Sequence, residues 1–299
     1  MKLRRLHIIL FLATASACLW SCDGSLDLVG MFWTRSDTPD ERFEQSRSLD
    51  VDPTNTRIQY APSRDYRVYL LSDIHVDQTT LNLDKFVHTY VADRTAADFC
   101  LFMGDYVNRS GVFPLVSQHL QPVADAGRKI FGTPGNHDIY YGEWKEYAAL
   151  FGASSYVFTV MLPEGGSDLY ICLDSASGSL GRKQMEWLRS SLEAYAGFPF
   201  RHRIVFTHTN FFKEDGYQGH SGNFNVEETL DLCGLFHRYG VGLVLTGHRH
   251  YRNETFFEGV RYVTLDASSD SQTNPHYAVL SLSDGSAEIN FVPLDSTVK

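Results

Sequence analysis

The sequence predicts a fold of the α/β (or α+β) class, and three observations lead to this prediction. Between residues 67 and 245, short apolar runs of strand length alternate with segments of helical periodicity. From residue 255 onward, polar and apolar residues alternate, which is typical of antiparallel strands with one exposed face. Hydrophobic residues make up 43% and charged residues 21% of the 299 residues. This composition is that of a soluble globular chain, with one large domain or two small ones.

Residues 1–21 are expected to be a signal peptide of the lipoprotein type. Three basic residues precede a mostly apolar stretch, 6–19, that is too short to span a bilayer comfortably. The string Leu19-Trp20-Ser21-Cys22 resembles a bacterial lipoprotein signal, although Trp20 stands where a small residue is usual. We therefore expect an exported, membrane-anchored bacterial lipoprotein on the periplasmic or cell-surface side, with its lipid at Cys22. Cys18 is a competing site, and a plain secretory signal is the alternative.

Residues 22–65 are polar and contain proline, and we expect a tether followed by a strap that packs partly on the domain. Beyond the signal region, the chain has three cysteines, Cys100, Cys172 and Cys233, each within an apolar stretch. An odd number without close spacing favours buried free thiols over a disulfide or a metal site.

The domain is expected to span residues 66–295 and to begin with a β-α-β-α-β unit. Buried strands are predicted at 67–71, 98–103 and 129–131. Asn82 is a candidate cap for the first helix, whose apolar residues from Leu83 to Val91 follow helical spacing. A second helix is expected at about 114–126. Polar residues follow each strand at its carboxyl end, where α/β sheets bind ligands.

The second half of the domain is expected to add further strands and two helices. One helix covers 181–195, and the other starts at the capping pair Asn225 and Glu228 and runs through Phe236. Strands are predicted at 156–160, 169–173, 203–206 and 241–245, and in the tail at 255–257, 261–265, 277–282 and 288–292. We expect the tail strands to form a second, largely antiparallel sheet.

Five loops follow apolar runs and carry residues able to bind a metal. They contain Asp73 and His75, Gly104-Asp105, Gly135-Asn136-His137-Asp138, Thr207-His208, and Gly247-His248-Arg249-His250. The ligands on offer are oxygen and nitrogen atoms, which suit Mn, Fe, Zn or Mg. Together they suffice for two cations, which at a separation of roughly 3.5–4 Å can polarise a phosphoryl group and generate hydroxide.

Each loop taken alone has a plainer interpretation. Asp-x-His and Gly-Asp strings usually form turns, and Gly135-Asn136-His137-Asp138 is also consistent with a turn and a helix cap. His248 and His250 are more specific, because residues i and i+2 of an extended segment face the same side. The five loops in this order are far more specific than any one of them.

This series of motifs resembles the calcineurin-like metallophosphoesterase family over about residues 66–295. The strings Gly104-Asp105-Tyr106-Val107-Asn108-Arg109 and Gly247-His248-Arg249-His250 contribute to the match, as does Leu173-Asp174-Ser175 in the middle of the chain. The resemblance implies two mixed β-sheets flanked by helices, with two divalent metal ions at the strand ends.

The resemblance also implies a role for each residue. Asp73, His75 and His250 would hold the first metal, Asn136, His208 and His248 the second, and Asp105 would bridge the two. His137 would stabilise the phosphoryl oxygens or protonate the leaving alcohol, and Asp138 would orient its ring. No covalent enzyme intermediate is expected.

Two neighbouring residues are weaker candidates for substrate binding. Asn108 stands where purple acid phosphatases carry a tyrosine ligand, which argues against a ferric-tyrosinate site. Arg109 can hold a substrate phosphate, although a solvated loop arginine is an equal alternative.

The function expected from the resemblance is metal-dependent hydrolysis of a small phosphoester, by a phosphodiesterase or a broad phosphoesterase. A phosphomonoesterase or pyrophosphatase is the alternative, and a non-catalytic metal-binding module on the same fold is a third. The formal net charge of −10 argues against a nucleic-acid partner, because phosphate contacts require clustered Lys and Arg.

Overall fold

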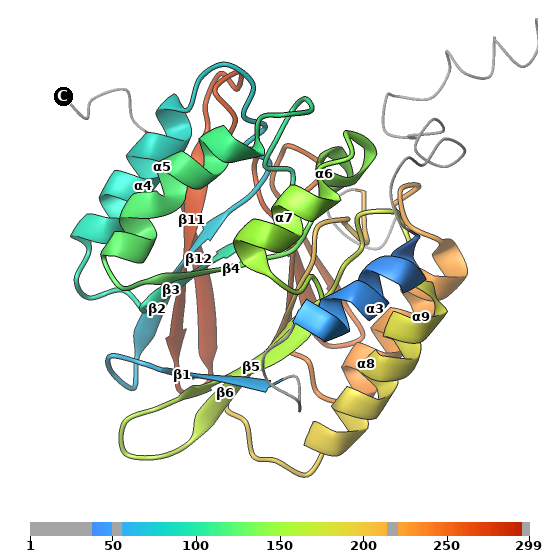
Figure 1. Cartoon of the computed structure of the whole chain (residues 1–299). Coiled ribbons are helices and arrows are strands. Elements are labelled where there is room, and N and C mark those ends of the chain that lie inside the picture. Colours follow the sequence, from blue (N-terminus) through green and yellow to red (C-terminus); the bar gives the residue numbers. More distant parts are fainter. Residues whose placement is uncertain (1–37, 50–55, 214–220, 295–299) are drawn as a thin grey trace, which may run out of the picture.

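The computed structural model describes residues 38–49, 56–213 and 221–294. Within them, two β-sheets lie face to face and helices cover both outer faces (Figure 1). The predicted signal peptide, including Cys18 and Cys22, lies outside the described residues. The expected fold of two mixed sheets flanked by helices is confirmed.

The five-stranded sheet has the order β12-β11-β2-β3-β4. Its strands are β2 (Tyr66–Leu71), β3 (Phe99–Phe102), β4 (Lys129–Gly132), β11 (His276–Ser283) and β12 (Ser286–Pro293). The first three are parallel neighbours, whereas β11 is antiparallel to both β2 and β12. The carboxyl ends of β2, β3 and β4 therefore meet at one edge of the sheet.

The seven-stranded sheet has the order β1-β5-β6-β7-β8-β10-β9. Its strands are β1 (Thr56–Tyr60), β5 (Tyr156–Met161), β6 (Ser167–Cys172), β7 (Arg203–Phe206), β8 (Leu243–Thr246), β9 (Asn253–Phe257) and β10 (Val260–Thr264). Strands β6, β7, β8 and β10 are parallel, and β5 and β9 are antiparallel to their neighbours β6 and β10.

Alternation along the strands divides the core into layers. On β2, Val68 and Leu70 face the other sheet, whereas Tyr69 and Leu71 face the helices. Because both faces of this strand are covered, it reads in the sequence as a continuous apolar run. The layer between the sheets is rich in aromatic rings, among them Phe158 and Tyr170, which stack 4.7 Å apart.

Helices on the five-stranded side are α4 (Leu81–Ala92), α5 (Phe113–Asp125) and α7 (Trp144–Phe151). On the opposite side of the molecule lie α8 (Gly181–Tyr195), α9 (Val226–Arg238) and α3 (Pro39–Leu49), the last packed on α8 (Figure 1). Each long helix presents its periodic apolar face to a sheet. Within the described ranges, no helix combines the length and apolar character needed to cross a membrane.

Several local predictions are confirmed. The strands and helices expected between residues 66 and 245 are present with small shifts of their ends. Asn225 caps α9 by accepting a hydrogen bond from the Glu228 N–H at 3.1 Å. The thiols of Cys100, Cys172 and Cys233 are free and buried, as predicted.

Other predictions are wrong. The tail strands do not form a sheet of their own: β9 and β10 extend the seven-stranded sheet, and β11 and β12 extend the five-stranded one. Asn82 does not cap α4, since the helix begins at Leu81 and the carboxylate of Asp270 accepts the N–H groups of Leu81 and Asn82. By contrast, the strap does pack on the domain as expected: its helix α3 packs on α8 and its edge strand β1 pairs with β5, although neither element was predicted. Helix α7 was not predicted.

Candidate metal centre

The five candidate loops converge where the carboxyl ends of strands from both sheets meet. Asp73 and His75 follow β2, Asp105 follows β3, and Asn136 begins the short helix α6 (Asn136–Tyr140) after β4. From the other sheet, β7 delivers His208 and β8 delivers His248 and His250. The first two loops are joined by backbone hydrogen bonds, from the N–H of Asp73 to Gly104 at 3.1 Å and from that of His75 to Asp105 at 3.0 Å.

Two glycines permit the close approach of these loops. A Cβ added to Gly247 would lie 1.9 Å from Ser72 Oγ and 2.5 Å from Asp73 Oδ2. A Cβ added to Gly135 would lie 2.1 Å from Asp105 Oδ1 and 2.3 Å from its backbone nitrogen. Contacts this short do not occur between ordinary side chains, so these positions require glycine for space.

Backbone strain is concentrated at the predicted ligands. Positive φ angles occur at Asp73 (51°), His75 (45°), Asp105 (56°), His248 (74°) and His250 (62°). Among the described residues, only two other non-glycine residues have a positive φ. Such conformations cost of order 1–3 kcal/mol each and persist where the surrounding structure enforces them, commonly at functional sites.

One group of ligand atoms comes from Asp73, His75, Asp105 and His250, and these atoms all lie within 4.8 Å of one another. The Nε2 atoms of His75 and His250 are 2.9 Å apart, and His250 Nε2 is 3.5 Å from Asp73 Oδ1. Asp73 is fully buried and is oriented by hydrogen bonds from the Ser72 hydroxyl and from the N–H of His248.

A second group comes from Asp105, His208 and His248. His208 Nε2 lies 3.4 Å from Asp105 Oδ2 and 3.1 Å from His248 Nδ1. The side-chain oxygen of Asn136 joins this group, at 2.9 Å from His208 Nε2 and 2.8 Å from His248 Nδ1. Asp105 is the member that both groups share, so the structure brings all seven predicted ligands together around it.

The hydrogen bonding of His208 fits a bound cation. Its Nδ1 lies 2.7 Å from the carbonyl oxygen of Met103, which can only accept a hydrogen bond. In the neutral ring this places the proton on Nδ1, so Nε2 carries a lone pair and faces the Asn136 oxygen, a second acceptor. A metal ion held by both atoms would satisfy their lone pairs, and the Met103 carbonyl would orient the imidazole for it.

Burial also shapes the electrostatics of the site. It lowers the pKa of His75 and His248 well below the usual value, with a further contribution from the neighbouring imidazoles. It raises the pKa of Asp105 well above the usual value, and the carboxylates of Asp73 and Asp138 raise it further. Neutral imidazoles and closely spaced buried carboxylates are the surroundings in which a divalent cation is stabilised.

His137 lies beside the first group without belonging to either. Its ring centroid is 4.5 Å from that of His75 and 5.5 Å from that of Tyr141, a residue that no motif pointed to. Burial lowers the pKa of His137 to about 3, and His208 and His250 contribute. The ring is therefore neutral at physiological pH and presents an N–H group as a hydrogen-bond donor.

Asp138 connects two of the loops. Its Oδ2 accepts the N–H groups of Asp105 and Gly135 at 2.9 and 2.7 Å, and its Oδ1 accepts those of Tyr106 and Val107 at 2.9 and 3.3 Å. Burial raises the pKa of Asp138 to about 7, and these four donors oppose that rise. The family resemblance implies a further role for Asp138, to orient the His137 ring, and this role stays a prediction.

The two weaker substrate candidates lie outside the ligand groups. Asn108 is exposed, and its backbone N–H donates to Val76. The Arg109 side chain is 56% exposed and forms an ion pair with Asp77, with Nε at 2.6 Å from Oδ1. Because the two side chains are 56% and 44% exposed, solvent screens this ion pair.

Comparison with known proteins supports the assignment of the fold. Residues 66–252 match a family model described as "Calcineurin-like phosphoesterase". Similar solved structures include GAP50, described as the anchor in the inner membrane complex of Plasmodium, with a TM-score of 0.59 and 15% identity over 78% of this chain and 86% of that chain. Another is a dimetal phosphatase from Danio rerio, with a TM-score of 0.58 and 12% identity over 77% and 96% of the two chains. A third is a purple acid phosphatase from yellow lupin (Lupinus luteus) seeds, with a TM-score of 0.57 and 13% identity over 79% and 52%. At these identities the likeness is one of fold.

Proposed function

The chain belongs to the calcineurin-like phosphoesterase family, and from this premise we propose that it hydrolyses a small phosphoester with the help of two divalent metal ions. The observation that carries the proposal is the position of Asp105. Its carboxylate belongs to both groups of ligand atoms, which is the arrangement a dinuclear centre requires.

Each residue then has a defined task. Asp73, His75 and His250 would hold one ion, and Asn136, His208 and His248 would hold the other, with Asp105 as the ligand that both groups share. Bound ions of this kind polarise a phosphoryl oxygen and make hydroxide available at neutral pH. Mn, Fe, Zn and Mg all suit this set of oxygen and nitrogen ligands.

His137 is proposed to stabilise the phosphoryl group as a neutral hydrogen-bond donor. Its lowered pKa supports this task over proton donation to the leaving alcohol, since a ring with a pKa of about 3 carries no extra proton at pH 7. A donor placed where negative charge develops stabilises the transition state more than the ground state.

Among possible substrates, we favour a phosphodiester, or a broad range of phosphoesters, over a monoester. A terminal phosphate carries two charges and gains more from a free guanidinium group than a singly charged diester does. Arg109, the arginine predicted to supply it, is paired with Asp77. A phosphomonoesterase or pyrophosphatase is the alternative that the assay must distinguish.

The decisive assay uses metal-stripped protein with paired chromogenic substrates, one a phosphate monoester and one a diester. Each is tested with added Mn, Zn, Fe or Mg, and Asp105→Asn is the matched variant. Activity that one metal restores and Asp105→Asn abolishes is the expected result. No hydrolysis by a protein that binds two ions would instead favour a non-catalytic module, unless a wider panel of phosphoesters reveals a narrow substrate.

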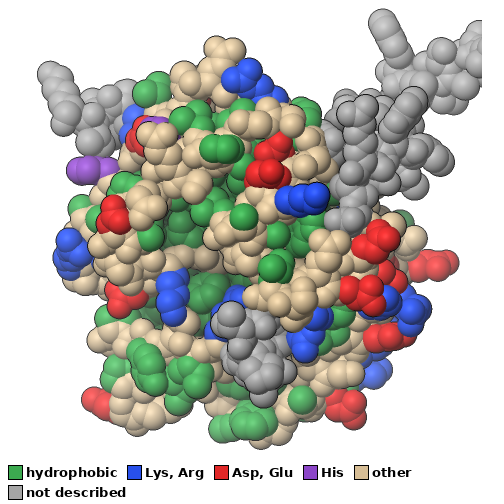
Figure 2. Space-filling model, viewed as in Figure 1, with side chains coloured by type: hydrophobic (Ala, Val, Ile, Leu, Met, Phe, Trp, Pro, Cys, Tyr) green, Lys and Arg blue, Asp and Glu red, His purple; other side chains and the backbone are tan. Residues whose placement is uncertain are grey.

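Nucleic acid is not expected as the partner. On the face shown in Figure 2, Lys and Arg side chains are scattered among Asp and Glu rather than gathered into one patch. The net charge of −10 agrees with this expectation. Clear binding of DNA at moderate salt would overturn it.

We further propose that the chain is exported and anchored by a lipid at Cys22, on the basis of the sequence of residues 1–22. Cys22→Ser should release the protein from the membrane fraction, whereas Cys18→Ser should not. If Cys22→Ser stays in the membrane with unchanged mass, the lipid is not attached there.

A further inference from the structure

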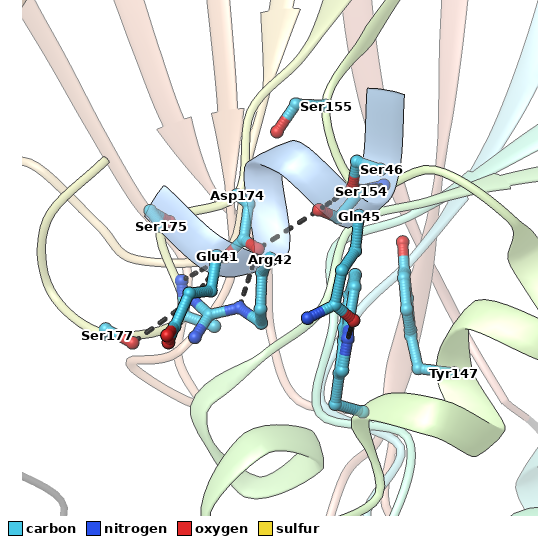
Figure 3. A network of polar contacts seen from close by, with 12 residues as sticks. Glu41, Arg42, Gln45, Ser46, Tyr147, Ser154, Ser155, Asp174, Ser175 and Ser177 are labelled. Atoms are coloured by element: carbon cyan, nitrogen blue, oxygen red, sulfur yellow. Dashed lines mark hydrogen bonds and ion pairs between the residues drawn. The ribbon is translucent and has the colours of Figure 1, made fainter. Parts of the chain in front are cut away.

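Helix α3 is held against the domain by a buried arginine. The Arg42 guanidinium donates from Nε to Asp174 Oδ2 at 2.9 Å and from Nη2 to Asp174 Oδ1 at 3.0 Å (Figure 3). The side chains are 0% and 2% exposed, although the two residues are 132 positions apart in the sequence. A buried ion pair with two parallel hydrogen bonds fixes distance and orientation together.

The same helix is fastened to the domain at two further points. The Ser46 hydroxyl lies 2.8 Å from that of Ser154, which in turn donates to Asp174 Oδ2 at 3.1 Å (Figure 3). The indole N–H of Trp144, the first residue of α7, donates to Gln45 at 2.7 Å. Helix α3 is therefore an integral part of the surroundings of Asp174.

Asp174 lies within a short segment, 173–175, that supports two of the ligand loops of the second metal group, those of Asn136 and His208. The carbonyl oxygen of Leu173 accepts the hydroxyls of Thr133 and Thr207 at 2.7 and 2.8 Å. Thr133 precedes Asn136 by three residues, and Thr207 precedes His208 directly.

Ser175 supports the same loop from the other side of His208. Its hydroxyl oxygen accepts the N–H of Thr209 at 2.8 Å and lies 2.6 Å from the hydroxyl oxygen of Thr207, whose proton is donated to Leu173. His208 thus lies between two residues that are both bonded to the segment 173–175. By contrast, the hydrogen bonds just described do not reach the loops of Asp73 and His250.

We propose that Arg42 is a positioning residue for the metal ion held by Asn136, His208 and His248. The ion pair with Asp174 fixes the segment 173–175, and this segment fixes the backbone on both sides of His208. The inference rests on the proposed dinuclear site. It implies that helix α3, which precedes the domain in the sequence, affects how tightly this metal ion is bound.

The chain offers a matched control on the same strand. At the opposite end of β6, Arg201 forms an ion pair with the buried Asp168, at 3.1 Å from Nε and 2.6 Å from Nη2. Arg42→Lys and Arg201→Lys each keep the charge and lose the fork of parallel hydrogen bonds. Both substitutions remove two parallel hydrogen bonds to a buried aspartate, but only Arg42→Lys removes them at the segment that supports the metal-ligand loops.

The experiment is a calorimetric Mn²⁺ titration of the metal-stripped full chain. His208→Ala and His250→Ala assign the two binding events to the two groups of ligands. We expect Arg42→Lys to weaken the event that His208→Ala removes by about tenfold or more, the effect typical of losing a partner that orients a ligand. The other event should stay within about twofold, and Arg201→Lys should leave both unchanged.

Equal weakening of both events by Arg42→Lys, no weakening at all, or the same selective loss in Arg201→Lys would overturn the inference. If Arg42→Lys fails to fold, Ser175→Ala removes the acceptor for Thr209 without touching the ion pair, and it should show the same selective loss. A wild-type protein that binds two Mn²⁺ ions and hydrolyses no phosphoester would refute the proposed function, while the binding comparison would still decide this inference.

Discussion

Replacing Gly135 by alanine tests whether close packing of two loops holds the bridging carboxylate in place. The glycine has φ −99° and ψ 175°, which any residue can adopt, so alanine introduces no backbone strain. The only change is the new methyl group, at 2.1 Å from Asp105 Oδ1 and 2.3 Å from the Asp105 nitrogen. One of these neighbours is backbone and cannot rotate away.

The cost can be worked out from two contributions. Overpacking of a tight site costs typically 1–3 kcal/mol. Moving the loops apart also lengthens a hydrogen bond to Asp138, which accepts the N–H groups of both Gly135 and Asp105, and a bond to a charged group contributes about 1.5–3 kcal/mol. The expected loss is therefore about 3–5 kcal/mol, or on the order of 10 °C in Tm for a domain of this size.

Urea unfolding of the metal-free protein and Mn²⁺ titration of the folded variant are the two assays. Gly234→Ala is the control, since this glycine lies inside α9 and a Cβ there meets nothing within 4 Å. Gly234→Ala should raise the free energy of unfolding by about 1 kcal/mol, whereas Gly135→Ala should lower it. A Gly135→Ala protein with wild-type stability and wild-type metal affinity would refute the packing argument.

Three further predictions concern the same centre. Asp138→Asn should cost about 3 kcal/mol of stability, because an amide turns its NH₂ group toward two of the four backbone N–H donors, and an unchanged urea midpoint would contradict this. For His137, the pKa falls from 6.5 to about 3 on folding, so its contribution to stability is present above pH 6.5 and is lost as the pH falls. Metal-free wild type should therefore lose stability on acidification from pH 6.5 more steeply than His137→Gln, and equal slopes would argue against a buried neutral ring. Finally, chelation should lower Tm, since an ion at 100 times its Kd contributes ~2.7 kcal/mol per site, and re-addition of metal should restore it. A Tm that does not change when the chelator is added would contradict the presence of a metal centre.

The identity of the ligands could be predicted from local sequence. Asp73, His75, Asp105, Asn136 and the histidines each follow an apolar run, and strands buried on both faces produce such runs. Their roles around the metals came from a family resemblance rather than from spacing, and the structure adds that all seven side chains meet around Asp105.

Local sequence did not predict the contacts that orient these ligands. Five of them have a positive φ, which aspartate and histidine adopt more often than most residues, but the residue type alone does not show at which positions the packing of the loops enforces it. The function of Asp138 as a clamp for backbone N–H groups likewise depends on the neighbouring loop of Asp105, 33 residues earlier in the chain.

Local periodicity predicted most strands and helices of the domain and their buried faces, because periodicity is a local property of the chain; α3, β1 and α7 were not predicted. Which strands pair could not be predicted locally, because pairing depends on contacts between distant parts of the chain. Alternation of polar and apolar residues predicts both β9 and β11 as strands. However, β9 pairs with β10 in the seven-stranded sheet, whereas β11 pairs with β2 in the five-stranded sheet. The ion pair of Arg42 and Asp174 belongs to this second category, since nothing local links residues 132 positions apart. Long-range partners are chosen by the free energy of the whole packed domain.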